Sequence, residues 1–114
     1  QIHIGQRNSR MYSKELLRTS KYCLVLRGKV DGISGDTIIE TKNRRNHLFM
    51  ELREYEKVQL ESYMYLTGLH KSILTEHYNS TSNQIYYNHS DVFWKLCLDE
   101  IIKFMDTYIV PHIE

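Results

Sequence analysis

Residues 21–44 read KYCLVLRGKVDGISGDTIIETKNR, and this stretch decides the fold. Its first half is rich in β-branched and aromatic residues, which predicts a strand from Tyr22 to Ile33. A tight Ser34-Gly35-Asp36 turn follows, and residues 36–44 predict a second strand, so the pair is expected to form a β-hairpin. Apolar and polar residues do not alternate strictly here, which is typical of a central strand covered on both faces.

After the hairpin, the sequence predicts a basic loop over residues 43–48 and then a helix from Phe49 to Leu66. Gly68 is expected to cap the C-terminus of this helix. Residues at three- and four-residue spacing define its expected packed face: Leu52, Tyr55, Gln59, Tyr63 and Leu66. The expected solvent face carries Glu51, Glu54, Lys57 and Glu61.

The remaining segments complete an α/β pattern. Two short strands are expected over residues 72–79 and 84–90, separated by a turn at 80–83. A final amphipathic helix is expected from the Ser90-Asp91 N-cap to a stop at Pro111. In the weakly patterned residues 1–20, Met11-Tyr12 and Leu16-Leu17 favour a strand over a short helix. This order predicts a mixed central β-sheet flanked by α-helices, with room for an extra strand first.

Length and composition restrict the class of protein. The 114 residues suit one domain over 1–114, and the chain begins with Gln1 rather than Met, so we expect either a complete small protein or a piece of a longer one. Apolar residues make up 41% and charged residues 25%, a balance that excludes wholesale disorder. No run approaches the ~20 apolar residues of a membrane helix, and no signal-peptide pattern is visible.

Cysteine, histidine and aromatic residues are expected to be structural. The two cysteines, Cys23 and Cys97, cannot form a four-cysteine zinc site or an Fe–S cluster, and their apolar neighbours predict reduced core thiols. The six histidines show no zinc-binding spacing. The aromatic residues next to the final helix are expected in the core rather than as a base-stacking platform: Tyr86, Tyr87, Phe93 and Trp94.

Three charged residues interrupt the apolar hairpin. Glu40 and Lys42 lie two residues apart, so they share one face of their strand, and the hairpin brings Asp31 back toward Glu40. Two carboxylates suit Mg²⁺ or Mn²⁺, with the carbonyl of Thr41 as a further ligand, and Lys42 adds positive charge for a phosphoryl group. The alternative is a surface salt bridge, but charges in an apolar hairpin are expensive to bury unless they are paired or bound to a metal.

These motifs resemble the PD-(D/E)xK nuclease superfamily, in its RecB-like and lambda-exonuclease-like branch. The resemblance covers about residues 20 to 79. It includes a G-x-x-D strand ending at Asp31, an E-x-K strand over residues 40–42, and a Q-x-x-x-Y pair at Gln59 and Tyr63. It implies a restriction-endonuclease-like core, a Mg²⁺ or Mn²⁺ cofactor, Asp31 and Glu40 as metal ligands, and Lys42 as the catalytic lysine.

The resemblance also implies that Gln59 and Tyr63 support the active site and contact DNA. Their i, i+4 spacing places them on one helical face. The alternative for this pair is an ordinary packed helix with Tyr63 half-buried. The loop after the catalytic strand adds Asn43, Arg44 and Arg45 as expected phosphate contacts, against the alternative of a solvated basic loop.

The leading hypothesis is a Mg²⁺-dependent deoxyribonuclease, an intracellular RecB-like exonuclease that acts on DNA in the cytoplasm or nucleus during recombination, repair or replication. A helicase or recombination partner is expected in cis or in trans. The alternatives are a structure-selective endonuclease such as a junction resolvase, an inactive nuclease-fold DNA-binding or scaffolding module, and a plain α/β interaction domain. Family members usually carry a helix before the hairpin, and none is visible before Tyr22, so either the chain is a fragment or the core is reduced.

Overall fold

The computed structural model describes residues 6–7 and 10–113, with side chains from Arg10 onward. Before the first helix lie β1 (Gln6–Arg7), β2 (Tyr12–Arg18), β3 (Cys23–Gly28), β4 (Gly32–Ser34) and β5 (Thr37–Asn43). Helix α1 (Glu54–Thr67) is followed by β6 (Lys71–Tyr78) and β7 (Thr81–Asn88). The chain continues through α2 (Asp91–Phe104), a π-helical turn (Met105–Ile109) and α3 (Val110–Ile113).

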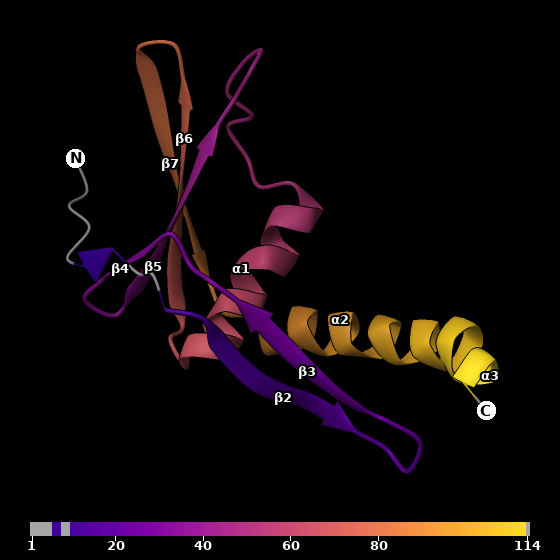
Figure 1. Cartoon of the computed structure of the whole chain (residues 1–114). Coiled ribbons are helices and arrows are strands. Elements are labelled where there is room, and N and C mark those ends of the chain that lie inside the picture. Colours follow the sequence, from indigo (N-terminus) through magenta and orange to yellow (C-terminus); the bar gives the residue numbers. More distant parts are fainter. Residues whose placement is uncertain (1–5, 8–9, 114) are drawn as a thin grey trace.

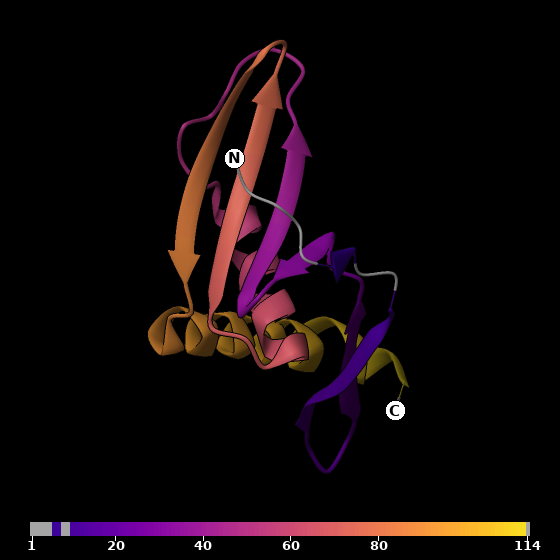
Figure 2. The same cartoon turned by 90° about the vertical axis from the view of Figure 1, so that its left-hand side faces the viewer.

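Within the described residues, five strands form one mixed sheet in the order β1-β4-β5-β6-β7. The pairs β4–β5 and β6–β7 are antiparallel hairpins, whereas β5 and β6 run parallel because α1 carries the chain back along the sheet. Figure 1 shows this sheet nearly edge-on with α1 and α2 on the same side of it, and Figure 2 shows its other face. The predicted α/β fold, a mixed sheet with helices packed on it, is confirmed.

The predicted first strand of the hairpin, Tyr22–Ile33, is in fact two strands. β3 pairs with β2 in a separate two-stranded sheet, and β4 pairs with β5 in the main sheet. Between them the backbone bends so that Val30, only 2% exposed, enters the core. The predicted turn is confirmed, because Gly35 adopts φ 62° in a two-residue connection that favours glycine. The strand predicted within residues 1–20 is β2, but it pairs with β3 instead of joining the main sheet.

Helix α1 begins later than predicted, at Glu54 rather than Phe49. The main-chain N–H groups of Phe49 and Met50 donate to the carboxylate of Glu76, and Met50 has a positive φ of 65°, so this segment is a loop held to β6. The helix ends as predicted at Gly68, which adopts φ 78° and donates its N–H to the carbonyl of Met64.

The C-terminal predictions are confirmed in type and corrected at their boundaries. β7 begins at Thr81, so three residues expected in a turn pair with β6 instead, and the reversal falls at Asn79, which has φ 54°. Ser90 caps α2 by accepting the N–H of Phe93. The helical path does not stop at Pro111. Since proline has no N–H, the turn before it widens, and Val110 donates to Met105 in the i→i−5 pattern.

The core lies between α1 and the sheet and is formed by Val30, Ile38, Leu60, Met64 and Leu74. Four predictions of burial were wrong. Glu61 is fully buried rather than solvated, while Tyr55, Tyr86 and Cys23 are exposed rather than packed. The buried side of α1 follows Glu56, Leu60, Glu61 and Met64, so it includes two carboxylates that a hydrophobic pattern assigns to solvent. No helix among the described residues is long and apolar enough to cross a membrane.

Candidate functional site

Strand β5 presents Glu40 and Lys42 on the face that α1 covers. Their spacing puts both side chains on one side of the strand, together with the core residue Ile38. Glu40 is 3% exposed, and its Oε2 atom lies 3.1 Å from the Lys42 ammonium. The side chain of Lys42 is 26% exposed, so the site is reachable from solvent at its lysine.

Asp31 reaches the same strand from the bend between β3 and β4. Its Oδ2 atom accepts the main-chain N–H of Thr41 at 2.9 Å, which fixes the carboxylate beside β5. In the β4–β5 ladder Gly32 pairs with Ile39, so the residue before Gly32 comes next to Glu40. The structure therefore brings the two carboxylates and the ammonium group together beside the start of β4, as the sequence predicts.

Glu40 is under electrostatic strain in this position. Burial is the largest factor that raises its pKa, and the neighbouring Asp31 carboxylate adds to it. Against the opposing effect of Lys42, the pKa is raised to about 7. Its Oε1 atom is buried and has no hydrogen-bond partner among the described residues. An unpartnered buried carboxylate oxygen is costly, so this atom is available for a cation or a proton.

Helix α1 extends the site through a chain of hydrogen bonds. Lys42 donates to Gln59 Oε1 at 2.8 Å, and Gln59 donates through its amide to the Tyr63 hydroxyl at 2.9 Å. Burial raises the pKa of Tyr63, and the nearby Glu40 carboxylate adds to this effect, so the phenol stays protonated. Gln59 and Tyr63 are therefore linked to Lys42 by hydrogen bonds, rather than packing as isolated core side chains.

The donor set fits a hard divalent cation, although only partly. Mg²⁺ is usually held by one or two carboxylates with waters and phosphate oxygens completing its shell, which Asp31 and Glu40 can supply. The described residues contain no group of three His, Cys, Asp or Glu side chains placed to hold a metal. The carbonyl of Thr41 as a third ligand stays a prediction, since the contact found for this residue is its N–H.

The expected DNA contacts in the loop after β5 divide into two groups. Asn43 and Arg45 are exposed, and their role stays a prediction. Arg44 is not available to a phosphate. Its side chain is 7% exposed and is held by Glu56 at 2.8 Å and Glu76 at 2.9 Å. The structure thus corrects the assignment of Arg44 to DNA binding and gives it a structural role.

Sequence reasoning missed the cluster around Glu76. Its carboxylate accepts hydrogen bonds from the Phe49 and Met50 N–H groups, the Asn83 amide and the Arg44 guanidinium. Burial alone would raise the pKa of Glu76, but these donors lower it to about 2. The signal was present in the sequence, because Glu76 interrupts the apolar strand SILTEHY much as Glu40 interrupts TIIETK.

Another buried carboxylate, Glu61, joins α1 to the start of α2. It accepts hydrogen bonds from the Tyr87 hydroxyl and the Ser90 N–H, and it lies 2.6 Å from His89 Nδ1. The other ring nitrogen of His89 lies 2.7 Å from Asp91. The hydrogen bond that His89 donates to the Glu61 carboxylate is the main factor that raises the pKa of His89. This group anchors α2 rather than forming a catalytic site.

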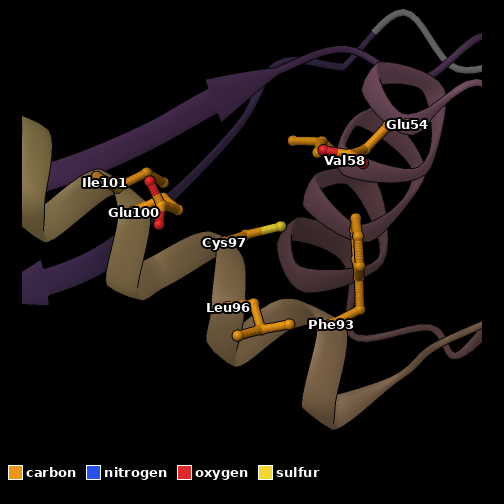
Figure 3. A pocket seen from close by; sticks show the side chains of 7 residues that line it. All are labelled: Glu54, Val58, Phe93, Leu96, Cys97, Glu100 and Ile101. Atoms are coloured by element: carbon orange, nitrogen blue, oxygen red, sulfur yellow. The ribbon is translucent and has the colours of Figure 1, made fainter.

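An apolar pocket of about 400 Å³ opens elsewhere, between α1 and α2. Figure 3 shows the side chains that line it: Glu54, Val58, Phe93, Leu96, Cys97, Glu100 and Ile101. None of the residues of the Asp31–Glu40–Lys42 site is among them. The pocket is therefore distinct from the Asp31–Glu40–Lys42 site.

Comparisons with known proteins inform the fold alone. No family model and no curated protein matches the chain. One similar solved structure, described as "Crystal structure of SSO0001", has a TM-score of 0.62 at 22% identity over 81% of this chain. This chain spans about half of that one, 48% of its length. The likeness supports the α/β fold, while the resemblance to the PD-(D/E)xK nucleases stays a prediction.

Proposed function

We propose that this chain is a Mg²⁺-dependent deoxyribonuclease domain that hydrolyses phosphodiester bonds, of the RecB-like exonuclease type. One observation carries the proposal. Glu40 is buried next to Asp31 and 3.1 Å from Lys42, and one of its oxygens has no hydrogen-bond partner in the described part of the chain. A folded chain tolerates such an arrangement most readily where a ligand completes it, and carboxylates beside an ammonium suit a cation together with a phosphate.

In this proposal each residue has a distinct role. Asp31 and Glu40 hold the Mg²⁺ or Mn²⁺ ion. The bound ion would supply Lewis-acid activation of the phosphodiester and of the attacking water. Lys42 has three N–H donors, of which Glu40 and Gln59 engage two, so the third is available to a phosphate oxygen where negative charge builds up.

Gln59 and Tyr63 are positioning residues. The Gln59 carbonyl oxygen directs the lysine, and the Tyr63 hydroxyl accepts from the Gln59 amide, which fixes the orientation of that amide. A lysine side chain is flexible, so holding it in one rotamer before substrate binds removes part of the entropic cost of catalysis. DNA as substrate, a role in recombination, repair or replication, and a helicase or recombination partner rest on the sequence resemblance.

A second candidate function is a nuclease-fold module that binds or scaffolds DNA without cleaving it. It is favoured by one observation. The described residues offer two carboxylates near Lys42 but no third acidic or histidine side chain placed for the same ion. In that case the carboxylate pair would be too weak a ligand set for catalysis, and the site would survive as a structural remnant.

The test is cleavage of labelled DNA by the purified chain with Mg²⁺, Mn²⁺ or EDTA. Linear duplex, single-stranded and four-way-junction substrates separate an exonuclease from a junction resolvase. We expect metal-dependent degradation that Lys42→Met reduces by about 10²-fold or more, because the substitution removes charge stabilisation while keeping side-chain length. Lys71→Met on the neighbouring strand is the matched control, since Lys71 is exposed and pairs only with the turn residue Asp36 among the described residues.

Equal activity of the wild type and Lys42→Met would refute the assignment of catalysis to the Asp31–Glu40–Lys42 site. DNA binding with no cleavage under any metal condition would favour the binding module.

A further inference from the structure

The basic residues of this chain are concentrated before the site. Residues 10–30 contain six of the 15 lysines and arginines but only one of the 14 acidic residues, Glu15. Every other acidic residue of the chain follows Val30. The net charge of +1 therefore hides a strongly basic segment joined to a more acidic remainder.

This basic segment folds as a two-stranded ribbon, β2 and β3, that does not join the main sheet. Figure 1 shows the ribbon extending away from the main sheet past α1. Its inner face packs on α1, where the Lys14 ammonium lies over the Tyr65 ring and the Tyr65 hydroxyl donates to the Glu15 carbonyl. Along β3, half-buried and exposed residues alternate, so the ribbon has a distinct outer face.

Several of the ribbon's cations already have partners. Lys14 is held against α1, Arg18 forms a 2.8 Å ion pair with Glu15, and Arg10 lies over the Tyr12 ring. Arg27 and Lys29 differ from them. Both are exposed, and neither side chain has a hydrogen bond or ion pair with any described residue. Two cations of this kind, two residues apart, attract an anion that the chain itself does not supply.

Their position relative to the site is decisive. Lys29 precedes Asp31 by two residues, and Arg27 precedes it by four. At about 3.3 Å per residue in extended backbone, these are separations of roughly 7 and 13 Å at most. Nucleotides rise about 3.4 Å each along one strand of DNA, so both cations lie within a few nucleotides of the proposed scissile phosphate.

We propose that two exposed cations, Arg27 on the outer face of the β2–β3 ribbon and Lys29 just beyond the end of β3, dock the phosphate backbone of DNA and lead it to the Asp31–Glu40–Lys42 site. This inference rests on the proposed function, because the acidic site next to the ribbon is what favours a phosphodiester polymer over another polyanion. Contacts of this kind are independent of sequence and set affinity, register and salt dependence rather than base specificity.

The experiment measures binding of a fluorescein-labelled duplex by anisotropy in EDTA, where no cleavage occurs, over a series of salt concentrations. The test variant is Arg27→Ala with Lys29→Ala. The matched control is Lys95→Ala with Lys103→Ala, which removes the same charge from α2, where both lysines are paired with acidic neighbours. Since both test positions are exposed, circular dichroism and thermal midpoints should stay those of the wild type.

We expect the test variant to bind more weakly and to lower the slope of log K against log salt by up to about 1.8, because each lost phosphate contact accounts for about 0.9. The control variant should keep the wild-type slope. An unchanged slope in the test variant, or equal losses in both variants, would overturn the docking surface. Tighter Arg27- and Lys29-dependent binding to anionic lipid vesicles than to DNA would overturn it as well.

The outcome is separable from that of the proposed function. If the test variant still cleaves DNA and its salt slope is unchanged, the docking surface is rejected and the proposed nuclease function stands. If DNA binding depends on Arg27 and Lys29 but no metal-dependent cleavage occurs, the docking surface stands and the catalytic role of the Asp31–Glu40–Lys42 site is rejected.

Discussion

Two buried ionic clusters lie between the sheet and α1, and they differ in one respect. Around Arg44, the carboxylates of Glu56 and Glu76 are completed by protein donors, and the pKa of Glu76 falls to about 2. Around Lys42, the Oε1 atom of Glu40 has no hydrogen-bond partner within residues 6–7 and 10–113, and the pKa of Glu40 rises to about 7. At Glu76 the same fold supplies hydrogen-bond donors to both oxygens of a buried carboxylate. The missing donor at Glu40 Oε1 therefore points to a ligand rather than to poor packing.

The largest expected effect comes from breaking the satisfied cluster. Arg44→Met should lower the free energy of unfolding by about 3–5 kcal/mol, because it leaves Glu56 and Glu76 buried without a counter-charge. Arg45→Met, one residue further in the same loop and exposed, should change it by less than about 0.5 kcal/mol. Urea denaturation of both variants measures the difference, and similar stabilities would refute the structural role of Arg44.

A second prediction compares substitutions of Glu76 and Glu40 at pH 8 in metal-free buffer. Glu76→Gln should destabilise the fold by about 1–3 kcal/mol, since a neutral amide loses charge-assisted hydrogen bonds. Glu40→Gln should leave the fold as stable or stabilise it, because it removes a buried charge with an unpartnered oxygen. Thermal or urea unfolding gives both values, and effects of the same sign would contradict the contrast.

The pH dependence of stability should follow the same difference. The lowered pKa of Glu76 means that its contribution is complete above the ordinary value of 4.5 and is lost as the pH falls toward about 2. The raised pKa of Glu40 works in the opposite sense. Its folded state keeps the proton longer, so stability declines as the pH rises from 4.5 through about 7. Unfolding curves of the wild type and Glu76→Gln should therefore converge in acid, and curves that stay parallel would refute this role of Glu76.

The smallest effect is expected at the Glu61–His89–Asp91 group. Because its carboxylate partners raise the pKa of His89, the stabilisation is complete below the ordinary value of 6.5 and is lost as the pH rises through the raised one. His89→Asn should therefore be less stable than the wild type at pH 6, with a smaller difference at high pH. His112→Asn, exposed on α3, is the control. A difference that does not change with pH would contradict a charged His89.

The sequence contained most of the site because strand periodicity and helix spacing are local. Two-residue spacing places Glu40 and Lys42 on one face, and i, i+4 spacing aligns Gln59 with Tyr63. The break of Tyr22–Ile33 into β3 and β4 was not predictable in the same way. It depends on which strands pair, and a β-rich run looks the same whether it belongs to one sheet or two.

Buried charge explains a second group of failures. Glu56, Glu61 and Glu76 are excluded from solvent because partners distant in sequence satisfy them, and a hydrophobic pattern has no means to find those partners. The same limitation assigned Arg44 to DNA. Its neighbour Arg45 has the same chemistry in sequence, and only the positions of Glu56 and Glu76 separate the two residues.

The central claim is that the Glu40 carboxylate binds a divalent cation. Calorimetric titration with Mn²⁺ tests this claim most directly. The wild type should show a saturable binding event that Glu40→Gln abolishes and that the control Glu100→Gln, at an exposed carboxylate of α2, leaves in place. A wild type that binds no Mn²⁺, or binding that Glu40→Gln does not change, would contradict the account.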